Sequence, residues 1–461
     1  MQIAMIGAGY VGLTTATCLA ELGHHVTCAD IDADRIERLS KGEVPIYEPG
    51  LEPLLKRCLE AGRLRFIDAV GGCVDEADAV FLAVGTPSRN DGEMDISQVE
   101  AAARQIAPHL KSGAVVVIKS TVTAGTCRRI REAIADARRS LDFSVASNPE
   151  FLREGSAIED FMTPDRIVIG ADDAKSAAVL RSIYRGFELD GVPVLSTSTG
   201  NAELIKQASN ALLALKIGFI NDVADLCEKM NGDVMAVAEG IGLDRRIGRS
   251  FLTPGPGYGG SCFPKDTRAF AATGRRFGAR QALVETLIEH NERRKEALAR
   301  RILADARLKR GGKVCVLGLA FKADTDDMRE SAALTVIPLL QRAGLHVQAH
   351  DPQAMENAKR MLEKVRYCES AYDAASDADA TVILTEWKEY RKLDLPRLAS
   401  AMRGRFLFDF RNLLSPKAAA KSGLTYVGRG RRALAAETET ARAVTPAVSP
   451  LDQRVAAPRH L

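Results

Sequence analysis

A glycine-rich turn near the start of the sequence constrains the fold more than any other feature. The apolar run over residues 2–6 predicts a strand, Gly7-Ala8-Gly9-Tyr10-Val11-Gly12 follows it, and residues 13–22 predict a helix. A second predicted strand, residues 25–29, ends on Asp30. This order is typical of a Rossmann unit that binds a dinucleotide. A glycine-rich turn without a ligand is the alternative.

Each residue of this turn has an expected role. Gly7 makes the tight turn, Gly9 lets a pyrophosphate approach the backbone at the helix N-terminus, and Gly12 permits close packing of helix and strand. The Asp30 carboxylate is placed to accept a hydrogen bond from a ribose 2′-hydroxyl. The sequence therefore predicts NAD rather than NADP as the cofactor.

Further predicted strands place polar residues at the carboxyl edge of the same sheet. Strands over residues 79–84 and 114–118 lead to Thr86 and Thr121, whose hydroxyls face the ligand crevice of a doubly wound sheet or merely cap the strands. A strand over 144–147 leads to Asn148-Pro149-Glu150-Phe151-Leu152-Arg153-Glu154-Gly155. If this segment is helical, Glu150 and Glu154 share a face. Solvated surface acids are the alternative.

A long helix is expected to join the two halves of the chain. Residues 200–230 predict one helix of roughly 45 Å. Its stretch 211–220 is apolar nearly all round, so we expect burial against two domains and a partner subunit. Lys206 and Asn210 share a face just before that stretch and could hold a developing oxyanion. A solvated lysine is the alternative.

One cysteine carries the features of a nucleophile. Cys262 follows Gly259-Gly260-Ser261, and Lys265 and Asp266 come shortly after it. Glycines allow close approach of a ligand, a cation favours the thiolate, and a carboxylate can handle a proton. A buried structural cysteine beside a loop is the alternative.

The last third of the chain repeats the pattern of the first. Residues 340–351 resemble residues 19–30, and residues 377–384 resemble residues 76–83. The repeat has lost the glycine fingerprint and gained Lys322, which with Arg329 and Arg411 suits a phosphate that is not part of NAD. From about residue 428 the apolar periodicity ends, as in a disordered tail.

These patterns predict an α/β fold with two Rossmann-like doubly wound domains joined by a long central helix. The expected parts are an NAD-binding domain over 1–198, a central helical dimerisation region with the cysteine loop over 199–308, a second Rossmann-like domain over 309–428, and a disordered tail over 429–461.

Composition excludes several other classes of protein. The 461 residues hold 63 basic and 60 acidic side chains without a basic block, which argues against nucleic-acid binding. Apolar runs stay below the ~18 residues of a membrane span. Nine cysteines without metal-binding spacing predict no metal site and, with no signal peptide, a cytoplasmic location.

Four segments together resemble the UDP-glucose 6-dehydrogenase family. They are the glycine-rich turn, the segment from Asn148 to Gly155, Gly257-Tyr258-Gly259-Gly260-Ser261-Cys262-Phe263-Pro264-Lys265-Asp266, and Phe321-Lys322-Ala323-Asp324-Thr325. The resemblance runs from residue 1 to about 427. One departure is Thr123, where the family usually has proline.

The resemblance implies oxidation of UDP-glucose to UDP-glucuronate by two NAD and one water, in a homodimer built on the central helix. By resemblance, Cys262 is the nucleophile, Lys206 and Asn210 stabilise the oxygen at C6, Asp266 and Thr121 position water, and Glu154 relays protons. Contacts to NAD are implied for Gly7, Gly9, Val11, Gly12, Asp30, Arg35, Thr86, Thr121, Glu154, Lys265 and Arg329. Contacts to the nucleotide sugar are implied for Glu150, Phe151, Leu152, Arg153, Glu154, Lys206, Asn210, Phe251, Leu252, Thr253, Pro254, Gly255, Gly259, Lys322 and Arg411, with Arg246 reaching a neighbour's site.

Two alternatives remain at this point. One is a sister dehydrogenase acting on GDP-mannose or a UDP-N-acetylhexosamine. The other is a non-catalytic NAD-dependent scaffold, which the presence of the thiol, lysine, amide and both acids disfavours.

Overall fold

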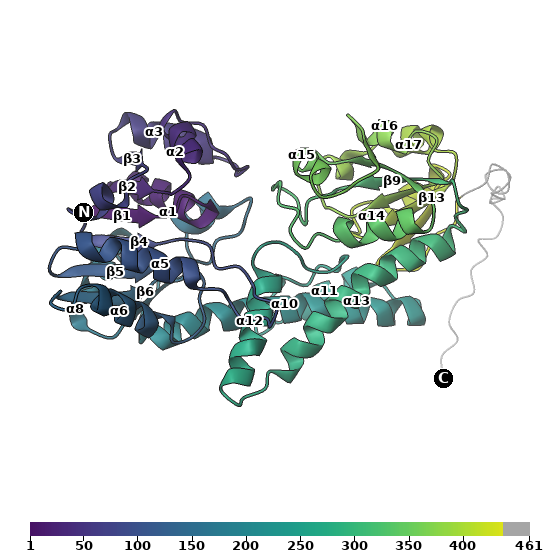
Figure 1. Ribbon diagram of the computed structural model, residues 1–461. Helices are drawn as coiled ribbons and strands as arrows, with labels where there is room; N and C mark the ends of the chain where they lie inside the picture. The colour runs from purple at the N-terminus through teal and green to yellow at the C-terminus, as the bar shows by residue number, and fades with distance from the viewer. Residues whose placement is uncertain (437–461) are drawn as a thin grey trace, which may run out of the picture.

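The computed structural model describes residues 1–436 as two α/β domains that flank a group of central helices. The N-terminal domain lies on the left of Figure 1 and the C-terminal domain on the right, with the central helices below and between them. This arrangement confirms the predicted fold class.

The N-terminal sheet has the strand order β3-β2-β1-β4-β5-β6-β7-β8. All neighbouring strands are parallel except β6 and β7, which pair antiparallel. Its strands are β1 (Gln2–Ile6), β2 (His25–Ala29), β3 (Leu64–Ile67), β4 (Ala79–Leu82), β5 (Ala114–Ile118), β6 (Phe143–Ser147), β7 (Ile167–Ala171) and β8 (Val194–Thr197). Its helices are α1 (Tyr10–Glu21), α2 (Ala33–Ser40), α3 (Leu51–Glu60), α4 (Val70–Val74), α5 (Ser97–Ile106), α6 (Thr126–Ala137), α7 (Ala157–Met162), α8 (Ala174–Ile183) and α9 (Arg185–Leu189).

Both faces of this sheet are covered, because its strands are apolar on both sides. Ile3 and Met5 of β1 belong to the hydrophobic cluster on one face, and Ala4 and Ile6 belong to the cluster on the other. Burial on both faces explains why these strands are continuous apolar runs rather than alternating ones.

The C-terminal sheet repeats the topology of the first six strands, with the order β11-β10-β9-β12-β13-β14 and all pairs parallel. Its strands are β9 (Lys313–Leu317), β10 (His346–His350), β11 (Val365–Tyr367), β12 (Ala380–Ile383), β13 (Phe406–Asp409) and β14 (Thr425–Gly428). Its helices are α14 (Ala333–Arg342), α15 (Met355–Lys359), α16 (Ala371–Ala375), α17 (Leu395–Ala401) and α18 (Pro416–Lys421). The internal repeat is confirmed.

The acid at the end of β10 shows how the repeat has diverged from the first unit. Asp351 occupies the place that Asp30 has after β2, but its Oδ2 accepts hydrogen bonds from the backbone of Leu319 and Ala320 at 2.7 and 3.0 Å and from Trp387 at 3.0 Å. This carboxylate is occupied by its own loop, which accords with the lost glycine fingerprint.

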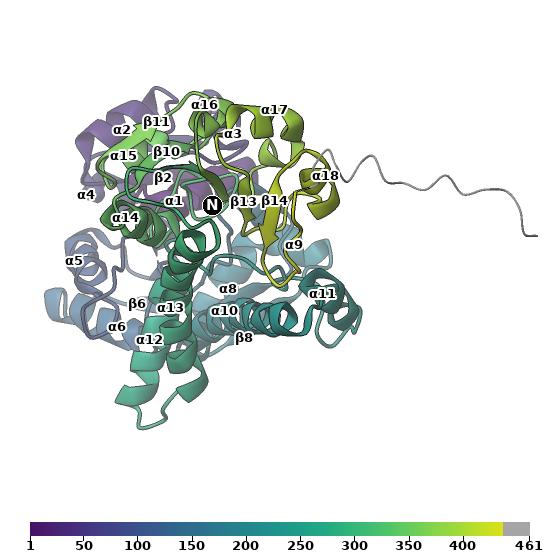
Figure 2. The same ribbon diagram turned by 90° about the vertical axis from the view of Figure 1, so that its right-hand side faces the viewer.

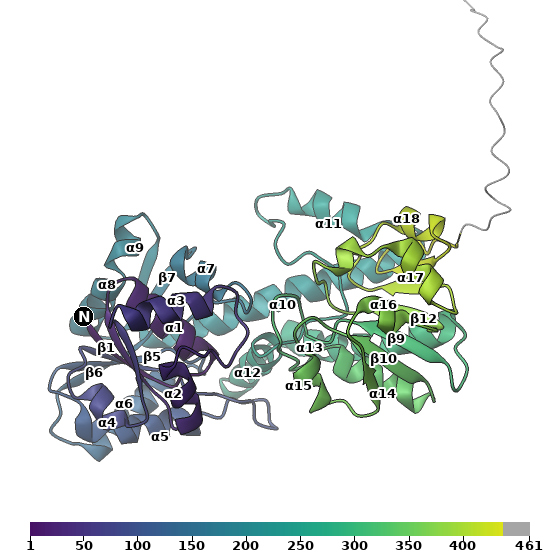
Figure 3. The same ribbon diagram turned by 90° about the horizontal axis from the view of Figure 1, so that it is seen from above.

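Helix α10 (Thr199–Met230) is the connection between the two domains. It begins after Ser198, whose side chain accepts from Asn201 N, and it ends at Asn231 in the left-handed conformation. With α11 (Val234–Gly242), α12 (Phe263–Arg276) and α13 (Ala282–Asp305) it forms the central region, which occupies the lower half of the molecule in Figure 2 and is seen from above in Figure 3.

Helix α10 buries one side within the chain and exposes another. Ala211, Ala214 and Ile220 are at most 2% exposed, whereas Leu212, Phe219 and Leu226 are 58–61% exposed. The three exposed side chains recur at every seventh position, so they lie on one face of the helix. Burial against the two domains therefore accounts for only part of this apolar helix.

The predicted boundary of the tail lies too early. Residues 429–431 are anchored to the central helices: Arg429 is 4% exposed, Gly430 O accepts from Val234 N at 2.9 Å, and Arg431 pairs with Asp233 at 3.1 Å. Ion pairs and backbone contacts of this kind leave no periodic pattern in the sequence, which explains the error. Residues 437–461 of the predicted tail lie outside the described residues.

Candidate active site

A cavity of about 890 Å³ lies where the N-terminal domain, the central helices and the C-terminal domain meet. The loop after β6 contributes Glu150 and Glu154, α10 contributes Lys206 and Asn210, and Cys262 comes from the loop before α12. The C-terminal domain adds its own wall, which is formed by Phe321 and Lys322. The structure therefore brings residues from distant segments of the sequence together around one cavity.

Cys262 is the residue that immediately precedes α12. Burial, followed by the Glu150 carboxylate, raises the pKa of its thiol to about 11, whereas the Lys206 ammonium acts in the opposite direction. We expected Lys265 to favour the thiolate, but its ammonium pairs with Asp266 at 2.7 Å. Lys206 is the cation that stabilises the Cys262 thiolate.

Lys206 and Asn210 lie on one face of α10, as their spacing predicted, and both are buried rather than solvated. Lys206 Nζ donates to Glu150 Oε1 at 2.9 Å, and Asn210 Nδ2 donates to Asp266 Oδ2 at 2.5 Å. Although burial lowers the pKa of Lys206, the nearby Glu150, Cys262 and Asp266 raise it overall. The cavity thus holds a permanent cation beside an amide donor, the groups that a developing oxyanion requires.

The segment that carries Glu150 and Glu154 is not helical, contrary to the condition we set for a shared face. Glu150 turns toward Lys206 and accepts from Leu152 N at 2.6 Å. Burial alone would raise the pKa of Glu150, but the Lys206 ammonium lowers it overall. The two carboxylates reach the cavity separately, with different partners.

Glu154 connects the cysteine loop to the C-terminal domain. Its Oε1 accepts from Ser261 Oγ at 2.6 Å, and Ser261 Oγ lies 3.4 Å from Cys262 Sγ. Its Oε2 accepts from Thr325 at 3.4 Å, and Arg329 lies 3.6 Å from Oε1. Burial, followed by the Asp327 carboxylate, raises the pKa of Glu154 to about 7. A carboxyl with this pKa can exchange a proton near neutral pH.

The glycine-rich turn has room for a pyrophosphate where the fingerprint requires it. A Cβ at Gly9 would meet no atom of the described residues within 4 Å, whereas a Cβ at Gly12 would collide with the Gly7 carbonyl. The residues therefore fit a dinucleotide: the backbone at Gly9 faces open space at the start of α1.

Asp30 ends β2 beside this turn. Its Oδ2 accepts from Ala8 N at 2.6 Å and from Arg35 Nη1 at 3.2 Å, and its Oδ1 accepts from Asp32 N at 3.0 Å. These bonds hold the carboxylate at the mouth of the turn. Arg35 is held at the mouth of the turn by its hydrogen bond to Asp30.

Two predicted threonines lie together at the carboxyl ends of β4 and β5. Thr86 Oγ1 donates to Thr121 O at 2.8 Å, so the two loops are joined there. Arg329, by contrast, lies in the C-terminal domain and forms a close ion pair with Asp327 at 2.7 Å beside Glu154.

The predicted nucleotide-sugar segment is only partly in the cavity. Phe251 and Gly259 line it, and the Phe251 ring packs against Phe263 at 5.9 Å. Leu252 is instead buried in the cluster formed with Ile220 and Val234. Beyond the lining lie Thr253, Pro254 and Gly255; a Cβ at Gly255 would stand 3.2 Å from Arg411 Nη1.

The remaining predicted cations have protein partners. Lys322 Nζ donates to the Glu154 carbonyl, and Arg411 Nε donates to Leu384 O at 2.7 Å. Arg153 pairs with Asp160 at 2.5 Å beside Phe151 and Leu152, which also line the cavity.

Arg246 does not reach this cavity within the chain. Its side chain is 89% exposed and pairs with Asp244 at 2.6 Å.

Sequence reasoning missed four residues of the site. Glu48, 6% exposed, accepts from Gly155 N at 2.6 Å and Ala157 N at 2.8 Å, and it also accepts from Tyr10. The other three line the cavity: Lys119, Arg166 and Ser261. Only Ser261 had a readable signal, because a hydroxyl adjacent to a thiol in the chain can reach it.

The described residues offer neither a cluster of metal-ligating side chains nor a helix that could span a membrane. Across the described part of the chain, histidine, cysteine and acidic side chains form no group of three or more that could hold a metal ion. None of the helices within residues 1–436 is long and apolar enough to cross a membrane.

Family models cover the three structural regions. The UDP-glucose/GDP-mannose dehydrogenase family matches with its NAD binding domain over residues 1–188, its central domain over 200–293 and its UDP binding domain over 315–416. The glycine-rich turn thus lies in a matched NAD-binding region.

Individual relatives cover nearly the whole chain. A UDP-glucose 6-dehydrogenase of Rhizobium meliloti is 50% identical over 435 residues, which is 94% of this chain and 100% of the relative. One of Bacillus subtilis is 43% identical over 94% of both chains. The solved structure of a UDP-glucose dehydrogenase from Pyrobaculum islandicum superposes with a TM-score of 0.85 at 42% identity and covers 89% of this chain and 94% of that one. The chain belongs to the UDP-glucose/GDP-mannose dehydrogenase family.

Proposed function

We propose that this protein oxidises UDP-glucose to UDP-glucuronate with NAD. Its similarity to UDP-glucose 6-dehydrogenases over nearly their whole length supports the substrate. The observation that carries the chemistry is that Cys262, Lys206, Asn210 and Asp266 line or adjoin one cavity formed by three segments of the chain.

NAD, when bound, accepts a hydride in each of two oxidations. The chain's part is to hold it: Gly7, Gly9, Val11 and Gly12 form the turn under the pyrophosphate, and Asp30 receives the ribose hydroxyl. The other residues proposed to contact NAD are Arg35, Thr86, Thr121, Glu154, Lys265 and Arg329.

The reacting carbon is C6 of the glucose unit. Lys206 and Asn210 hold the oxygen at C6 while it carries negative charge. The first oxidation leaves an aldehyde at C6. Cys262 adds to this aldehyde and forms a thiohemiacetal, which the second oxidation converts to a thioester. Since burial opposes ionisation of the thiol, the Lys206 ammonium is needed for thiolate to form.

Water completes the reaction by hydrolysing the thioester and freeing the thiol. We assign its positioning to Asp266 and Thr121. Glu154 receives the proton, because its carboxyl has a pKa of about 7 and reaches Cys262 through Ser261. The products are one carboxylate and a regenerated Cys262.

The nucleotide is assigned to the opposite wall of the cavity. Phe251 and Gly259 face it, and Lys322 and Arg411 supply positive charge near the phosphates. The other residues proposed to contact the substrate are Glu150, Phe151, Leu152, Arg153, Thr253, Pro254 and Gly255, with Leu252 acting through the loop that it anchors.

The functional unit is proposed to be a homodimer. The exposed stripe Leu212, Phe219 and Leu226 on α10 is self-complementary in chemistry, as an isologous interface requires. Leu212 also lines the cavity, so the stripe reaches the edge of the site. A second copy packed there could bring Arg246 of the partner subunit to this cavity.

Turnover of a panel of nucleotide sugars tests the proposal. The purified chain, with NAD, should form two NADH per UDP-glucose consumed. GDP-mannose and UDP-N-acetylmannosamine should be poor substrates. Preference for one of these two would transfer the assignment to a sister activity, and no NADH from any sugar would support the scaffold alternative.

A further inference from the structure

A second buried lysine, Lys119, lines the same cavity as Lys206 and Cys262. Lys119 follows β5, is 4% exposed, and donates from Nζ to Asn148 Oδ1 at 2.9 Å. The same oxygen accepts from Tyr184 Oη at 2.6 Å, and the Asn148 amide donates to Val168 O at 2.9 Å. Within residues 1–436, no carboxylate lies within ion-pairing distance of the Lys119 ammonium.

Lys119 lines the same cavity as Cys262 and is attracted to the carboxylate that Lys206 uses. Glu150 is 2.9 Å from Lys206, and its charge also acts on Lys119. Each of the three side chains is at most 5% exposed. Among the described residues Glu150 is paired with Lys206 and not with Lys119, so the Lys119 ammonium has no contacting carboxylate to compensate it in a region of weak screening.

We propose that Lys119 is a positioning residue for the reaction at Cys262: its buried ammonium, which no carboxylate contacts, adds positive charge to the wall of the cavity and so favours the Cys262 thiolate. The inference rests on the proposed function in one respect, namely that Cys262 is the nucleophile. Any added positive charge near a thiol favours its ionised form, and the effect is large where water is excluded.

The charge on Lys119 depends on pH within an accessible range. Burial lowers the pKa of Lys119 to about 8, a net value in which Glu150 opposes the shift and Lys206 adds to it. Lys119 is therefore charged below about pH 8 and neutral above it. The charged groups that face this triad from the other elements are Asp266 on α12 and Arg166 before β7. Tyr184 after α8 is the remaining titratable neighbour, and burial alone raises its pKa.

A purely structural role for Lys119 is the competing explanation, since it also holds Asn148. The chain offers a matched control, because Tyr184→Phe removes the other hydrogen bond to Asn148 Oδ1 without changing any charge. Lys119→Met removes the ammonium and keeps the length of the side chain. Replacement of a buried charge by a well-packed apolar group is often neutral or stabilising, so this variant is expected to fold. Lys119→Arg keeps the charge at every accessible pH.

The test is the rate at which iodoacetamide alkylates Cys262 in the full-length chain, with the modified peptide identified by mass. Cys262 is half-buried whereas the other eight cysteines are buried, so it should react first. At about pH 7, Lys119→Met should react roughly 3- to 10-fold more slowly than wild type, the range expected once the higher nucleophilicity of a less acidic thiol is allowed for. Tyr184→Phe should stay within about twofold of wild type.

The pH dependence separates charge from structure. At about pH 9.5 the gap between wild type and Lys119→Met should close, because wild-type Lys119 has lost its proton, and Lys119→Arg should react faster than wild type. Equal rates for wild type and Lys119→Met at pH 7, or equal slowing by Tyr184→Phe, would overturn the inference. Lack of NADH formation by wild type would count against the proposed function and leave the alkylation result standing.

Discussion

Glu154 is the residue whose environment makes the clearest prediction. Its pKa of about 7 in the folded chain exceeds the value of 4.5 for an unperturbed glutamate, because burial and then Asp327 disfavour the charge. The folded state therefore binds a proton more tightly than the unfolded state. The carboxyl costs no folding free energy below about pH 4.5, and the cost is complete above about pH 7.

We expect Glu154→Gln to raise the free energy of unfolding at pH 8 by on the order of 1–3 kcal/mol, which raises the melting temperature by a few degrees. Near pH 4.5 the melting temperature should be unchanged. The amide oxygen can still accept from Ser261, but the side chain cannot take a proton, so turnover should fall. Calorimetry at the two pH values measures the difference. Glu159→Gln, at an exposed carboxylate of the cavity rim, should change neither temperature. A loss of stability at pH 8 would contradict the assignment.

Cys262 should separate the two oxidations. Only the second oxidation requires the thiol, because the aldehyde must first gain a nucleophile, whereas returning hydride to the aldehyde does not. Cys262→Ala, given the 6-aldehyde of the UDP-sugar, should still reduce it with NADH but should oxidise it several orders of magnitude more slowly. The two rates are followed at the NADH absorbance, with the melting temperature as the folding control. If the folded Cys262→Ala variant oxidised the aldehyde near the wild-type rate, Cys262 would be excluded as the nucleophile.

At the scale of elements, the cysteine loop is held against the C-terminal domain by close backbone packing. Gly260 has a φ of +84°, and a Cβ there would lie 2.6 Å from the Phe321 ring. We expect Gly260→Ala to destabilise the chain by about 1–3 kcal/mol and to displace Cys262, because backbone and ring cannot both stay in place. Urea unfolding and turnover measure the two effects.

Gly200 provides the matched control for this substitution. It lies in the first turn of α10, and a Cβ there would meet no described atom within 4 Å. Gly200→Ala should be neutral or stabilising by up to ~1 kcal/mol, since alanine is the better helix former. Comparable losses at both positions would mean that the Gly260 effect is not steric.

The exposed face of α10 predicts the oligomeric state. Phe219→Glu with Leu226→Glu should break the proposed dimer, because each interface would then bury four carboxylates without partners. Sedimentation velocity should show a fall to the mass of one chain, 49.7 kDa. Met361→Glu, at a residue 50% exposed in the C-terminal domain, is the control and should leave the mass unchanged. A wild-type chain that sediments as a monomer would refute the proposed dimer directly.

Elements were predictable where local chemistry decides them. The strand over residues 2–6 is β1 residue for residue, and the helix predicted over 200–230 is α10 to within one residue, because apolar runs and caps are local signals. The juxtaposition of Lys206 with Glu150 was not predictable from pattern alone, since the two are 56 positions apart. The same holds for Lys119, whose significance depends on which charges surround it after folding.

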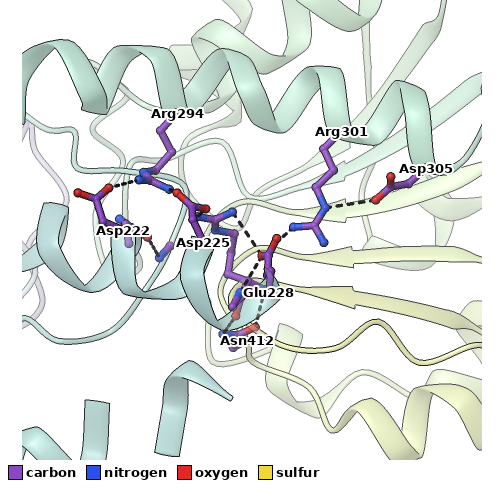
Figure 4. A network of polar contacts seen from close by, with 11 residues as sticks. Asp222, Asp225, Glu228, Arg294, Arg301, Asp305 and Asn412 are labelled. Atoms are coloured by element: carbon purple, nitrogen blue, oxygen red, sulfur yellow. Dashed lines mark hydrogen bonds and ion pairs between the residues drawn. The ribbon is translucent and has the colours of Figure 1, made fainter. Parts of the chain in front are cut away.

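At the scale of the whole molecule, one arginine fastens the end of the C-terminal domain to the central helices. Figure 4 shows a polar network in which Asp225 and Glu228 of α10 face Arg294 and Arg301 of α13. Arg429 Nη2 donates to Asp225 Oδ1 at 2.7 Å, and Arg429 N donates to Asn412 Oδ1 at 3.0 Å. Arg429 therefore fixes the exit of β14 on helix α10.

Arg429→Met should reveal how much this junction contributes. Asp225 keeps Arg294 at 2.7 Å and Glu228 keeps Arg301 at 2.9 Å, so the variant orphans neither carboxylate. We therefore expect a loss of roughly 1.5–3 kcal/mol, the range for one hydrogen bond to a charged group, rather than the larger cost of an unpaired buried charge. Arg431→Met is the matched control, because the Arg431 side chain is 21% exposed, against 5% for Arg429, and water therefore screens its pair with Asp233 more strongly.

The pH dependence of that loss identifies its origin. Although burial raises the pKa of Asp225, Arg429 and then Arg294 lower it below the ordinary value of 3.8. A carboxyl with a depressed folded-state pKa stabilises the fold above its unfolded value, and the stabilisation is lost as the pH falls through the folded value. The difference in melting temperature between wild type and Arg429→Met should thus be constant from pH 7 to about pH 4 and shrink below it.

Because α10 carries Lys206 and Asn210 while the C-terminal domain carries Lys322, the variant should also raise KM for UDP-glucose more than it lowers kcat. An unchanged melting temperature and KM would show that the two domains hold their positions without this contact.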